Sequence, residues 1–274
     1  MIRQVWGIYF SPCGDVEKVI RAMAAGAASR LGVPVRSADI TRPMARRKDY
    51  PWGPEELVFV GVPVYAGRVP NKLAPFLGSG LRGTGPAVPV VCFGNRSFDD
   101  ALSELYGLLR RGGFAVPAAA AAVCQHAFTP ALAPGRPTGE DLARAEVFAV
   151  QTAEKLLAAD GAPWLAQEDI PGSPSPRAYY QPLGLDGAPV DFLKATPTVD
   201  YALCNHCGTC GAVCPMGSVD RDDPGKMTGI CIKCQACIQG CKRGARSFTD
   251  SAFLSHRAML EQNYRRPAEP VFIL

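Results

Sequence analysis

The sequence predicts an α/β protein with a doubly wound, five-stranded parallel sheet, followed by a small α+β domain built around cysteines. Three features support this prediction. Over the first 160 residues, short apolar runs alternate with segments of helical periodicity. Residues 161–198 are broken by prolines and glycines, which favours a connector over regular structure. Beyond the connector, one spaced run of cysteines occurs twice.

Five apolar runs predict the strands of the sheet. They cover residues 5–10, 33–37, 57–60, 87–93 and 114–123. Helical periodicity predicts helices at residues 16–31, 71–77, 98–111 and 140–159. Asp15 is expected to cap the first helix, because its carboxylate can accept a hydrogen bond from a free N–H group of the first turn.

The alternation of strands and helices predicts parallel strands, because each helix carries the chain back to the same edge of the sheet. In such sheets, ligands bind beyond the carboxyl ends of the strands. The loops expected there are residues 11–15, 61–68, 94–98 and 124–129. The C-terminal region is expected to add a short strand at 199–203, a helix at 253–263, and an apolar end at 271–274 that packs back on the protein.

Eight of the eleven cysteines form two copies of one run, offset by 27 residues at every cysteine. The first run is Cys204, Cys207, Cys210 and Cys214, followed by Pro215. The second run is Cys231, Cys234, Cys237 and Cys241. This spacing is typical of cubane iron–sulfur sites, in which three closely spaced thiolates bind one cluster and a fourth comes from elsewhere.

The repeated run predicts two [4Fe-4S] clusters with crossed ligands, since in such proteins the fourth cysteine of each run ligates the other run's cluster. One cluster is assigned to Cys204, Cys207, Cys210 and Cys241, and the other to Cys231, Cys234, Cys237 and Cys214. Zinc is the main alternative, although a structural zinc site does not need the third cysteine at the same interval. The odd number of cysteines and the lack of a secretory leader disfavour a disulfide framework.

Length and composition limit the functions of the chain. Its 274 residues, 47% of them hydrophobic, suffice for one full domain and a small second one. No apolar stretch approaches the roughly 18 residues of a membrane span, and the N-terminal apolar run is too brief for a signal peptide. These features predict a cytoplasmic protein, and oxygen-sensitive clusters would suit an anaerobic setting.

The formal net charge of +4 does not indicate a nucleic-acid partner. Each oxidised cluster with four thiolates carries about −2, so the loaded protein is expected to be near neutral. One basic patch remains, as a solvated loop or as a docking surface for an acidic partner, at Arg42, Arg46, Arg47 and Lys48. The sequence does not specify the redox partner or the oligomeric state.

Several segments carry a resemblance to a known family. They are residues 8–12 with Gly14, residues 62–70, 93–98, 125–128 and 260–263, and the two cysteine runs. With them the chain resembles the fused flavodoxin-like/ferredoxin proteins, in which a flavodoxin-type domain precedes a bacterial-type ferredoxin with two [4Fe-4S] clusters. The expected segments are a flavodoxin-like domain at 1–160, a connector at 161–198, a two-cluster ferredoxin domain at 199–248, and a C-terminal helix and tail at 249–274.

The resemblance implies FMN in the first domain, with its phosphate at the N-terminus of the first helix. The residues implied in flavin binding are Ser11, Cys13, Gly14, Tyr65, Ala66, Gly67, Asn95, Arg96 and Phe98. Tyr65 would stack on the isoalloxazine ring, and the last three would line its pyrimidine edge. The phosphate loop departs from the family pattern, since only Ser11 keeps a hydroxyl and Asp15 would repel a phosphate unless it turns away. The alternative is an empty scaffold in which Tyr65 and Phe98 only cover the end of the sheet.

Three cysteines lie outside the runs, and one histidine lies in a loop at the end of the sheet. Cys92 and Cys124 are expected to be small core residues. Cys13 lies at a helix N-terminus, which lowers the pKa of a thiol, but a reactive role is the less favoured interpretation. His126 is either an ordinary loop residue or a proton donor to a flavin.

We expect an electron-transfer protein that exchanges electrons among its two clusters, an FMN and a redox protein. No catalytic residue is assigned. One alternative is an FMN-dependent reductase of a small substrate, fed by the clusters, with Tyr65, Cys13 or His126 as proton donor. The other is a flavin-free docking module for a redox enzyme.

Overall fold

The chain folds around a six-stranded sheet in the order β10-β7-β6-β4-β1-β2. The structure, a computed structural model, describes residues 1–158 and 164–274. Five strands run parallel: β1 (Gln4–Tyr9), β2 (Val35–Asp39), β4 (Glu56–Pro63), β6 (Ala87–Phe93) and β7 (Ala119–Val123). Numbered along the chain, they lie in the order 2-1-3-4-5, which is that of the flavodoxin-like fold. The predicted parallel, doubly wound α/β architecture is confirmed.

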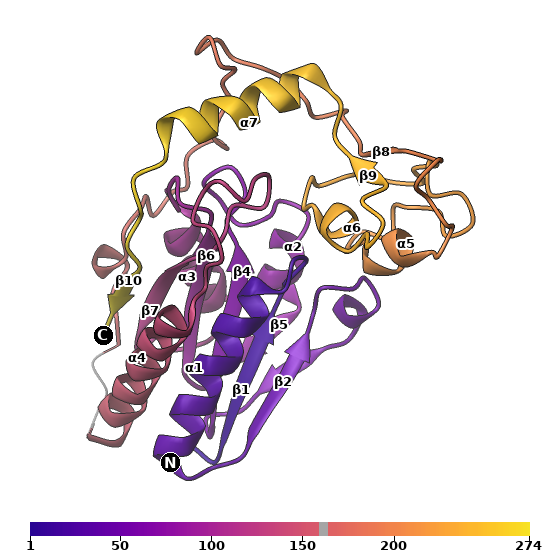
Figure 1. Cartoon of the computed structure of the whole chain (residues 1–274). Coiled ribbons are helices and arrows are strands. Elements are labelled where there is room, and N and C mark those ends of the chain that lie inside the picture. Colours follow the sequence, from indigo (N-terminus) through magenta and orange to yellow (C-terminus); the bar gives the residue numbers. More distant parts are fainter. Residues whose placement is uncertain (159–163) are drawn as a thin grey trace.

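Two helices cover each face of the sheet (Figure 1). The helices α1 (Asp15–Leu31) and α4 (Gly139–Ala158) pack on one face. The helices α2 (Ala74–Ser79) and α3 (Ala101–Arg111) pack on the other. Every residue of β6 is buried, because helices cover it on both sides. Strands buried on both faces read as continuous apolar runs, which explains the pattern in the sequence. Within the two described ranges, no helix has the length and apolar character that a membrane span requires.

The first helix is capped differently from the prediction. Gly14 holds the cap position in a left-handed conformation (φ 92°), which glycine adopts readily, and α1 begins at Asp15. The prediction that Asp15 caps the helix is therefore wrong. The hydroxyl of Ser11 accepts a hydrogen bond from the N–H of Glu17 (3.0 Å), whereas the carboxylate of Asp15 accepts one from Nζ of Lys18 (2.9 Å).

Two glycines allow α1 to pack closely on the sheet. A Cβ at Gly61 would lie 2.3 Å from Cγ1 of Ile20, and a Cβ at Gly7 would lie 2.9 Å from Cγ2 of the same side chain. Any larger residue would push the helix away from β1 and β4. The glycines thereby fix the N-terminus of α1 beside the carboxyl ends of these two strands.

Four predicted elements begin later than expected. The helix predicted at 71–77 is α2, which starts at Ala74 and ends at Ser79. The other three start late for a local reason. The predicted strand 114–123 is regular only from Ala119, since Pro117 lacks the N–H that a sheet requires. The predicted strand 33–37 follows Pro34 and starts at Val35. The predicted helix 98–111 starts at Ala101, because Asp99 has a left-handed backbone (φ 40°) that interrupts a helix.

Four strands of the described residues were not predicted: β3, β5 and β10, described here, and β9 (Arg246–Ser247), described below. β10 (Val271–Ile273) pairs antiparallel with β7, so the apolar end packs back as predicted but forms a sixth strand. β3 (Tyr50–Trp52) and β5 (Leu81–Gly83) form a separate two-stranded parallel sheet. The predicted helix end at residue 159 and the domain boundary at 160/161 lie outside the described residues. We refer to residues 1–158 together with β10 as the sheet unit.

Residues 164–197 are mostly irregular, as predicted, apart from one short 3-10 helix, η2 (Gln167–Asp169), and they pack on the sheet unit. Leu165 and Ile170 are buried in its core. The carboxylate of Asp100, itself buried, accepts hydrogen bonds from the N–H groups of Arg177 and Ser173 and from the guanidinium of Arg177. These bonds, chiefly the side-chain bond to Arg177, hold the pKa of Asp100 well below its usual range. The connector is thus an ordered arm.

Residues 198–248, here called the cysteine segment, contain two copies of one small unit. α5 (Thr209–Val213) in the first copy corresponds to α6 (Ala236–Gln239) in the second, 27 residues later. β8 (Thr198–Val199) and β9 (Arg246–Ser247) pair antiparallel and join the two ends of the segment. The strand predicted at 199–203 is limited to β8, because residues 201–203 form a turn.

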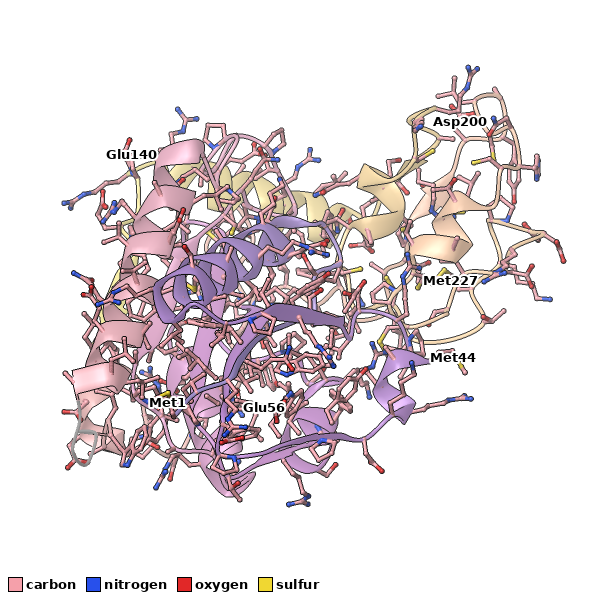
Figure 2. The ribbon with its side chains drawn as sticks, turned by 90° about the horizontal axis from the view of Figure 1, so that it is seen from below. Met1, Met44, Glu56, Glu140, Asp200 and Met227 are labelled. Carbon is pink, nitrogen blue, oxygen red and sulfur yellow. The ribbon has the colours of Figure 1, made fainter. Side chains whose placement is uncertain are left out.

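The last helix, α7 (Ser251–Asn263), leads from the cysteine segment back to the sheet. Its cap is Asp250, which accepts a hydrogen bond from the N–H of Phe253 (2.8 Å). Figure 1 shows α7, in yellow, passing over the strand ends, with α6 close to the N-terminal end of α1. In Figure 2, Met227 of the cysteine segment lies near Met44 of the sheet unit, and Asp200 lies at the far end. The cysteine segment therefore sits at the carboxyl edge of the sheet.

Candidate functional site

The eight cysteines of the two runs line two separate pockets. The inner pocket contains Cys231, Cys234 and Cys237 together with Cys214. The outer pocket contains Cys204, Cys207 and Cys210 together with Cys241. Each pocket therefore combines three cysteines of one run with the last cysteine of the other. The empty volumes of the two pockets are about 370 and 360 Å³, open solvent included.

The loops between the cysteines share an unusual backbone conformation. His206 (φ 53°) and Gly208 (φ 71°) are left-handed in the first run, and Lys233 (φ 56°) and Gln235 (φ 67°) are left-handed at the equivalent places in the second. Left-handed residues alternating with ordinary ones turn successive N–H groups toward one side and form anion-binding concavities. Three of these residues are not glycine, so the conformation is maintained at an energetic cost.

Hydrogen bonds to sulfur also occur in both pockets. The N–H of Ser218 donates to Sγ of Cys214 (3.3 Å) in the inner pocket. In the outer pocket, Sγ of Cys207 and Oγ1 of Thr209 form a hydrogen bond (3.2 Å). The hydrogen bonds from Thr209 lower the pKa of the Cys207 thiol. Such bonds stabilise thiolates, which are the form that binds metals.

The two pockets differ in burial. In the inner pocket, Cys234 and Cys237 are buried, with 9% and 8% of their surface exposed, and in the outer pocket Cys207 is exposed. Burial raises the pKa of Cys237 to about 11 and also raises the pKa of Cys231. Within residues 1–158 and 164–274, no group of three His, Cys, Asp or Glu side chains is placed to share a single metal ion.

Three hydrogen bonds attach the inner pocket to the sheet unit. The thiol of Cys13 donates to the carbonyl of Cys234 (3.0 Å). The guanidinium of Arg46 donates to the carbonyl of Pro215 (2.8 Å), the residue after Cys214. The amide of Gln239 donates to the carbonyl of Ala127 (3.4 Å). These contacts come from three different loops of the sheet unit and hold the inner pocket against it.

Cys13 therefore behaves differently from the prediction. Burial, and next the nearby Asp15 carboxylate, raise the pKa of its thiol to about 12. The helix N-terminus was expected to lower this pKa, but the loss of solvent outweighs that effect. Cys13 is a neutral hydrogen-bond donor.

Arg46 is the only member of the predicted basic patch that is not exposed. Besides Pro215, it donates to the carbonyls of Ile40 (2.9 Å) and Thr41 (2.7 Å). Arg42, Arg47 and Lys48 are exposed, as a solvated loop requires.

The loop expected to hold a phosphate, 11–15, presents few side-chain donors. The hydroxyl of Ser11 is already an acceptor for the N–H of Glu17, as described above. The N–H of Ser11 is also engaged, because it donates to Oγ1 of Thr41 (2.8 Å). Above Gly14 the space is open, with no atom within 4 Å of where a Cβ would lie. The carboxylate of Asp15 turns toward Lys18, as a nearby phosphate would require.

The second loop at the strand ends is a tight turn centred on Ala66 and Gly67. Both residues are left-handed (φ 48° and 79°), and the turn is closed by two hydrogen bonds between the backbones of Tyr65 and Arg68 (2.9 and 3.1 Å). The pKa of the Tyr65 phenol is raised, mainly by burial and next by the neighbouring Cys234. Tyr65 thus lies beside the inner pocket.

The third loop binds the C-terminal part of the chain. The amide nitrogen of Asn95 donates to the carbonyls of Tyr264 (2.5 Å) and Arg266 (3.0 Å), and its amide oxygen accepts from the N–H of Ala268 (2.9 Å). Only 4% of the surface of Asn95 is exposed. The side chain expected at the edge of a flavin is therefore fully engaged in holding the strand-forming tail.

The other two side chains of this loop also have partners in the chain. The guanidinium of Arg96 lies over the ring of Tyr180, 4.2 Å from its centroid, and forms an ion pair with Asp99. The ring of Phe98 packs edge-on against Phe93, with centroids 5.3 Å apart. Arg96 thus helps to hold the arm at 164–197 over the end of the sheet, and Phe98 packs against the end of β6.

His126 and the two remaining cysteines have structural roles. Nδ1 of His126 accepts a hydrogen bond from the N–H of Phe128 (3.1 Å), and burial lowers the pKa of the imidazole to about 4. The ring is neutral near pH 7, so it does not supply a proton from an imidazolium. Cys92 and Cys124 are buried, 4% and 5% exposed, which confirms the prediction that they are core residues.

Comparisons with known proteins show limited similarity. No protein-family model matches this sequence. No curated protein matches it either. Solved structures that match include a flavodoxin from the domain Archaea, with 16% identity, a TM-score of 0.39, and coverage of 56% of this chain and 99% of that chain. A Streptococcus pneumonia TIGR4 flavodoxin matches with 18% identity, a TM-score of 0.38, and coverage of 57% and 98%.

The apo form of an NADH:FMN oxidoreductase also matches, with 16% identity, a TM-score of 0.37, and coverage of 60% of this chain and 95% of that chain. At these identities and TM-scores the matches carry no argument about function. The flavodoxin-like fold is established by the strand order of the sheet itself.

Proposed function

We propose that the chain is an electron-transfer protein that carries two [4Fe-4S] clusters, one in each pocket. The observation that supports this most strongly is the crossed grouping of the cysteines around the two pockets. Crossed ligation is the arrangement of two-cluster ferredoxins. In this proposal, residues 199–248 form the ferredoxin domain.

The pockets fit such clusters in their chemistry. Each offers four cysteine sulfurs, which is the full ligand set of a cubane. The left-handed residues of both loops favour a negatively charged group, and a cluster with four thiolates carries about −2 in its oxidised form. N–H groups near the sulfurs, such as that of Ser218, are the kind of contact that tunes cluster potentials.

A bound [4Fe-4S] cluster supplies one-electron transfer, and the protein determines where the electron can enter. The exposed Cys207 brings the outer pocket to the surface, where a redox protein can approach it. The inner pocket is held against the sheet unit through Cys13 and Arg46. The fold therefore favours a route from an external partner through the outer site to the inner site and the sheet end.

Protein purified without oxygen is expected to contain about eight iron and eight acid-labile sulfide per chain, because two cubanes require these amounts. Metal analysis by mass spectrometry and a sulfide assay measure both. Zinc at one or two per chain, without sulfide, would contradict the proposal and establish the zinc alternative.

We propose FMN as a second cofactor, at the point of the sheet where the strand order reverses. In this fold that point lies between β1 and β4, and FMN binds there in flavodoxins. The open space above Gly14 and the N-terminus of α1 suit a phosphate. The side chains of this loop contribute little to phosphate binding, because Ser11 offers one hydroxyl and Asp15 brings a negative charge near the helix N-terminus. Backbone N–H groups would carry most of the binding, and we expect weak affinity.

Replacing Asp15 with threonine is expected to tighten FMN binding by at least tenfold, because the change removes a negative charge beside the phosphate and adds a hydroxyl. Lys18→Gln is the matched control and should weaken binding, since Lys18 pairs with Asp15 and neutralises it. Fluorescence quenching of added FMN measures both affinities. Equal affinities for the wild type and Asp15→Thr would argue against a phosphate at this loop.

A carrier is preferred over a flavin-dependent reductase because two of the three candidate proton donors, Cys13 and His126, are poor acids in this fold. The thiol of Cys13 is bonded to the carbonyl of Cys234, and His126 has a pKa of about 4. The flavin-free docking module remains the outcome if anaerobically purified protein binds no FMN at all.

A further inference from the structure

Arg246 is a buried arginine that adjoins both pockets. Only 4% of its surface is exposed. It lines the outer pocket, next to Ala245 and Arg243. It also lies near the inner pocket: its strand β9 contacts α6, which carries Cys237, and Phe248, two residues further on, lines that pocket. A single guanidinium is therefore placed between the two sets of cysteines.

The charge of Arg246 has no counter-ion among the described residues. Its Nη1 donates to the carbonyl of Pro224, and its Nη2 donates weakly to the carbonyl of Pro197 (3.5 Å). Its Nε is buried without any hydrogen-bond partner. The ion pairs of residues 1–158 and 164–274 do not include it. Burying a cation without an anion costs several kcal/mol, so an anion is expected nearby.

The internal repeat shows that packing does not require an arginine here. The equivalent residue in the first copy, 27 positions earlier, is Val219. Val219 is buried and lines the inner pocket, as Arg246 lines the outer one. An apolar side chain thus suffices to fill the corresponding place. What Arg246 adds is a charge and hydrogen-bond donors.

We propose that Arg246 is a positioning residue that holds a fixed positive charge between the two cluster sites and raises the reduction potential of both clusters. Each oxidised cluster with its thiolates carries about −2, and reduction adds one further negative charge. A buried positive charge stabilises the reduced form more than the oxidised form, because electrostatic interactions are stronger away from water. Nε of Arg246 is buried and has no hydrogen-bond partner among the described residues, so it is available to donate to a bound group.

The test compares two variants that separate charge from hydrogen bonding. Arg246→Gln keeps hydrogen-bond donors and removes the charge, whereas Arg246→Lys keeps the charge. We expect the equilibrium constants for reduction of both clusters to fall in Arg246→Gln, by tenfold or more, which is about 59 mV for one electron. Arg246→Lys and the control Val219→Ala should each change them less than threefold. Redox titration of the anaerobic protein followed by electron paramagnetic resonance measures these constants.

Because this role rests on the proposed clusters, iron and sulfide are measured in the wild type first. A wild type without clusters would overturn the proposed function itself. A wild type with clusters, and the same potentials in Arg246→Gln, would overturn only the role of Arg246. Arg246→Gln could also lose iron. If Arg246→Lys then keeps its iron, the result supports the role of the positive charge. If both variants lose iron equally, that role is contradicted, because the guanidinium would then serve only as a structural anchor.

Discussion

Replacing Cys241 with alanine is expected to remove the cluster proposed for the outer pocket and to leave the one proposed for the inner pocket, although Cys241 belongs to the second run. The reason is that Cys241 lines the pocket of Cys204, Cys207 and Cys210. The iron content should fall from about eight to about four per chain. Metal and sulfide analysis of anaerobic protein measures the loss.

Double variants test directly whether each cluster takes ligands from both runs. Cys207→Ala with Cys241→Ala should still lose only about four iron, because both residues line the outer pocket. Cys234→Ala with Cys241→Ala should lose about eight, because one residue is taken from each pocket. If each run held its own cluster, the two results would be exchanged. Cys92→Ala, which removes a core thiol of β6, is the control and should keep both clusters.

Lowering the pH from 7.5 to 5 is expected to reduce the free energy of unfolding by about 2 kcal/mol through His126 alone. The folded pKa of His126 is about 4, below the ordinary value of 6.5. The unfolded chain therefore binds a proton as the pH falls through 6.5, while the native protein resists it until about 4. Stability is full above 6.5 and is lost progressively below it. Urea unfolding at each pH measures the effect.

His126→Gln provides the comparison for this pH dependence. Its side-chain oxygen can accept the hydrogen bond that the N–H of Phe128 gives to Nδ1, but it does not titrate. The loss of stability between pH 7.5 and 5 should be about 2 kcal/mol smaller in the variant than in the wild type. His256, whose pKa is also lowered by burial, is present in both proteins and cancels. Identical pH profiles would show that His126 titrates normally in the fold.

The sheet was predictable because its strands are buried on both faces. Continuous apolar runs such as Ala87–Phe93 reflect that burial, and the structure has this strand at the predicted bounds. The grouping of the cysteines into two sites could be predicted because the spacing of the first run is repeated at every position of the second. Both signals are local in the sequence and do not depend on which segments meet in space.

What the sequence did not reveal depends on contacts between distant residues. The pairing of β10 with β7 joins residues about 150 positions apart in the chain, and nothing local marks it. The expected low pKa of Cys13 was wrong because the cysteine segment, more than 200 residues later, removes this thiol from water. Asn95 was expected at a flavin, and the tail that engages it is likewise remote.

Arg246 was overlooked for a different reason. Its identity gives no metal-ligand signal, and its burial follows only from the fold of the cysteine segment. The internal repeat does contain a signal, since aligning the two copies places Arg246 against Val219. A charged residue in one copy at a position that is apolar in the other can be found by such an alignment.

The pairing of β10 with β7 has a consequence for the cysteine segment. That segment is tied to the sheet unit on both sides, by the arm at 164–197 before it and by α7 and β10 after it. A segment attached at both ends cannot move away from the sheet unit, as a domain at the end of a flexible linker can. The distance between the cysteine segment and the sheet end is therefore set by the fold. Electron transfer between the cofactors proposed for them would then not depend on diffusion of a linker. Deleting β10 would leave the chain on the C-terminal side of the cysteine segment without its strand pairing to the sheet, so the arm at 164–197 would become the main attachment.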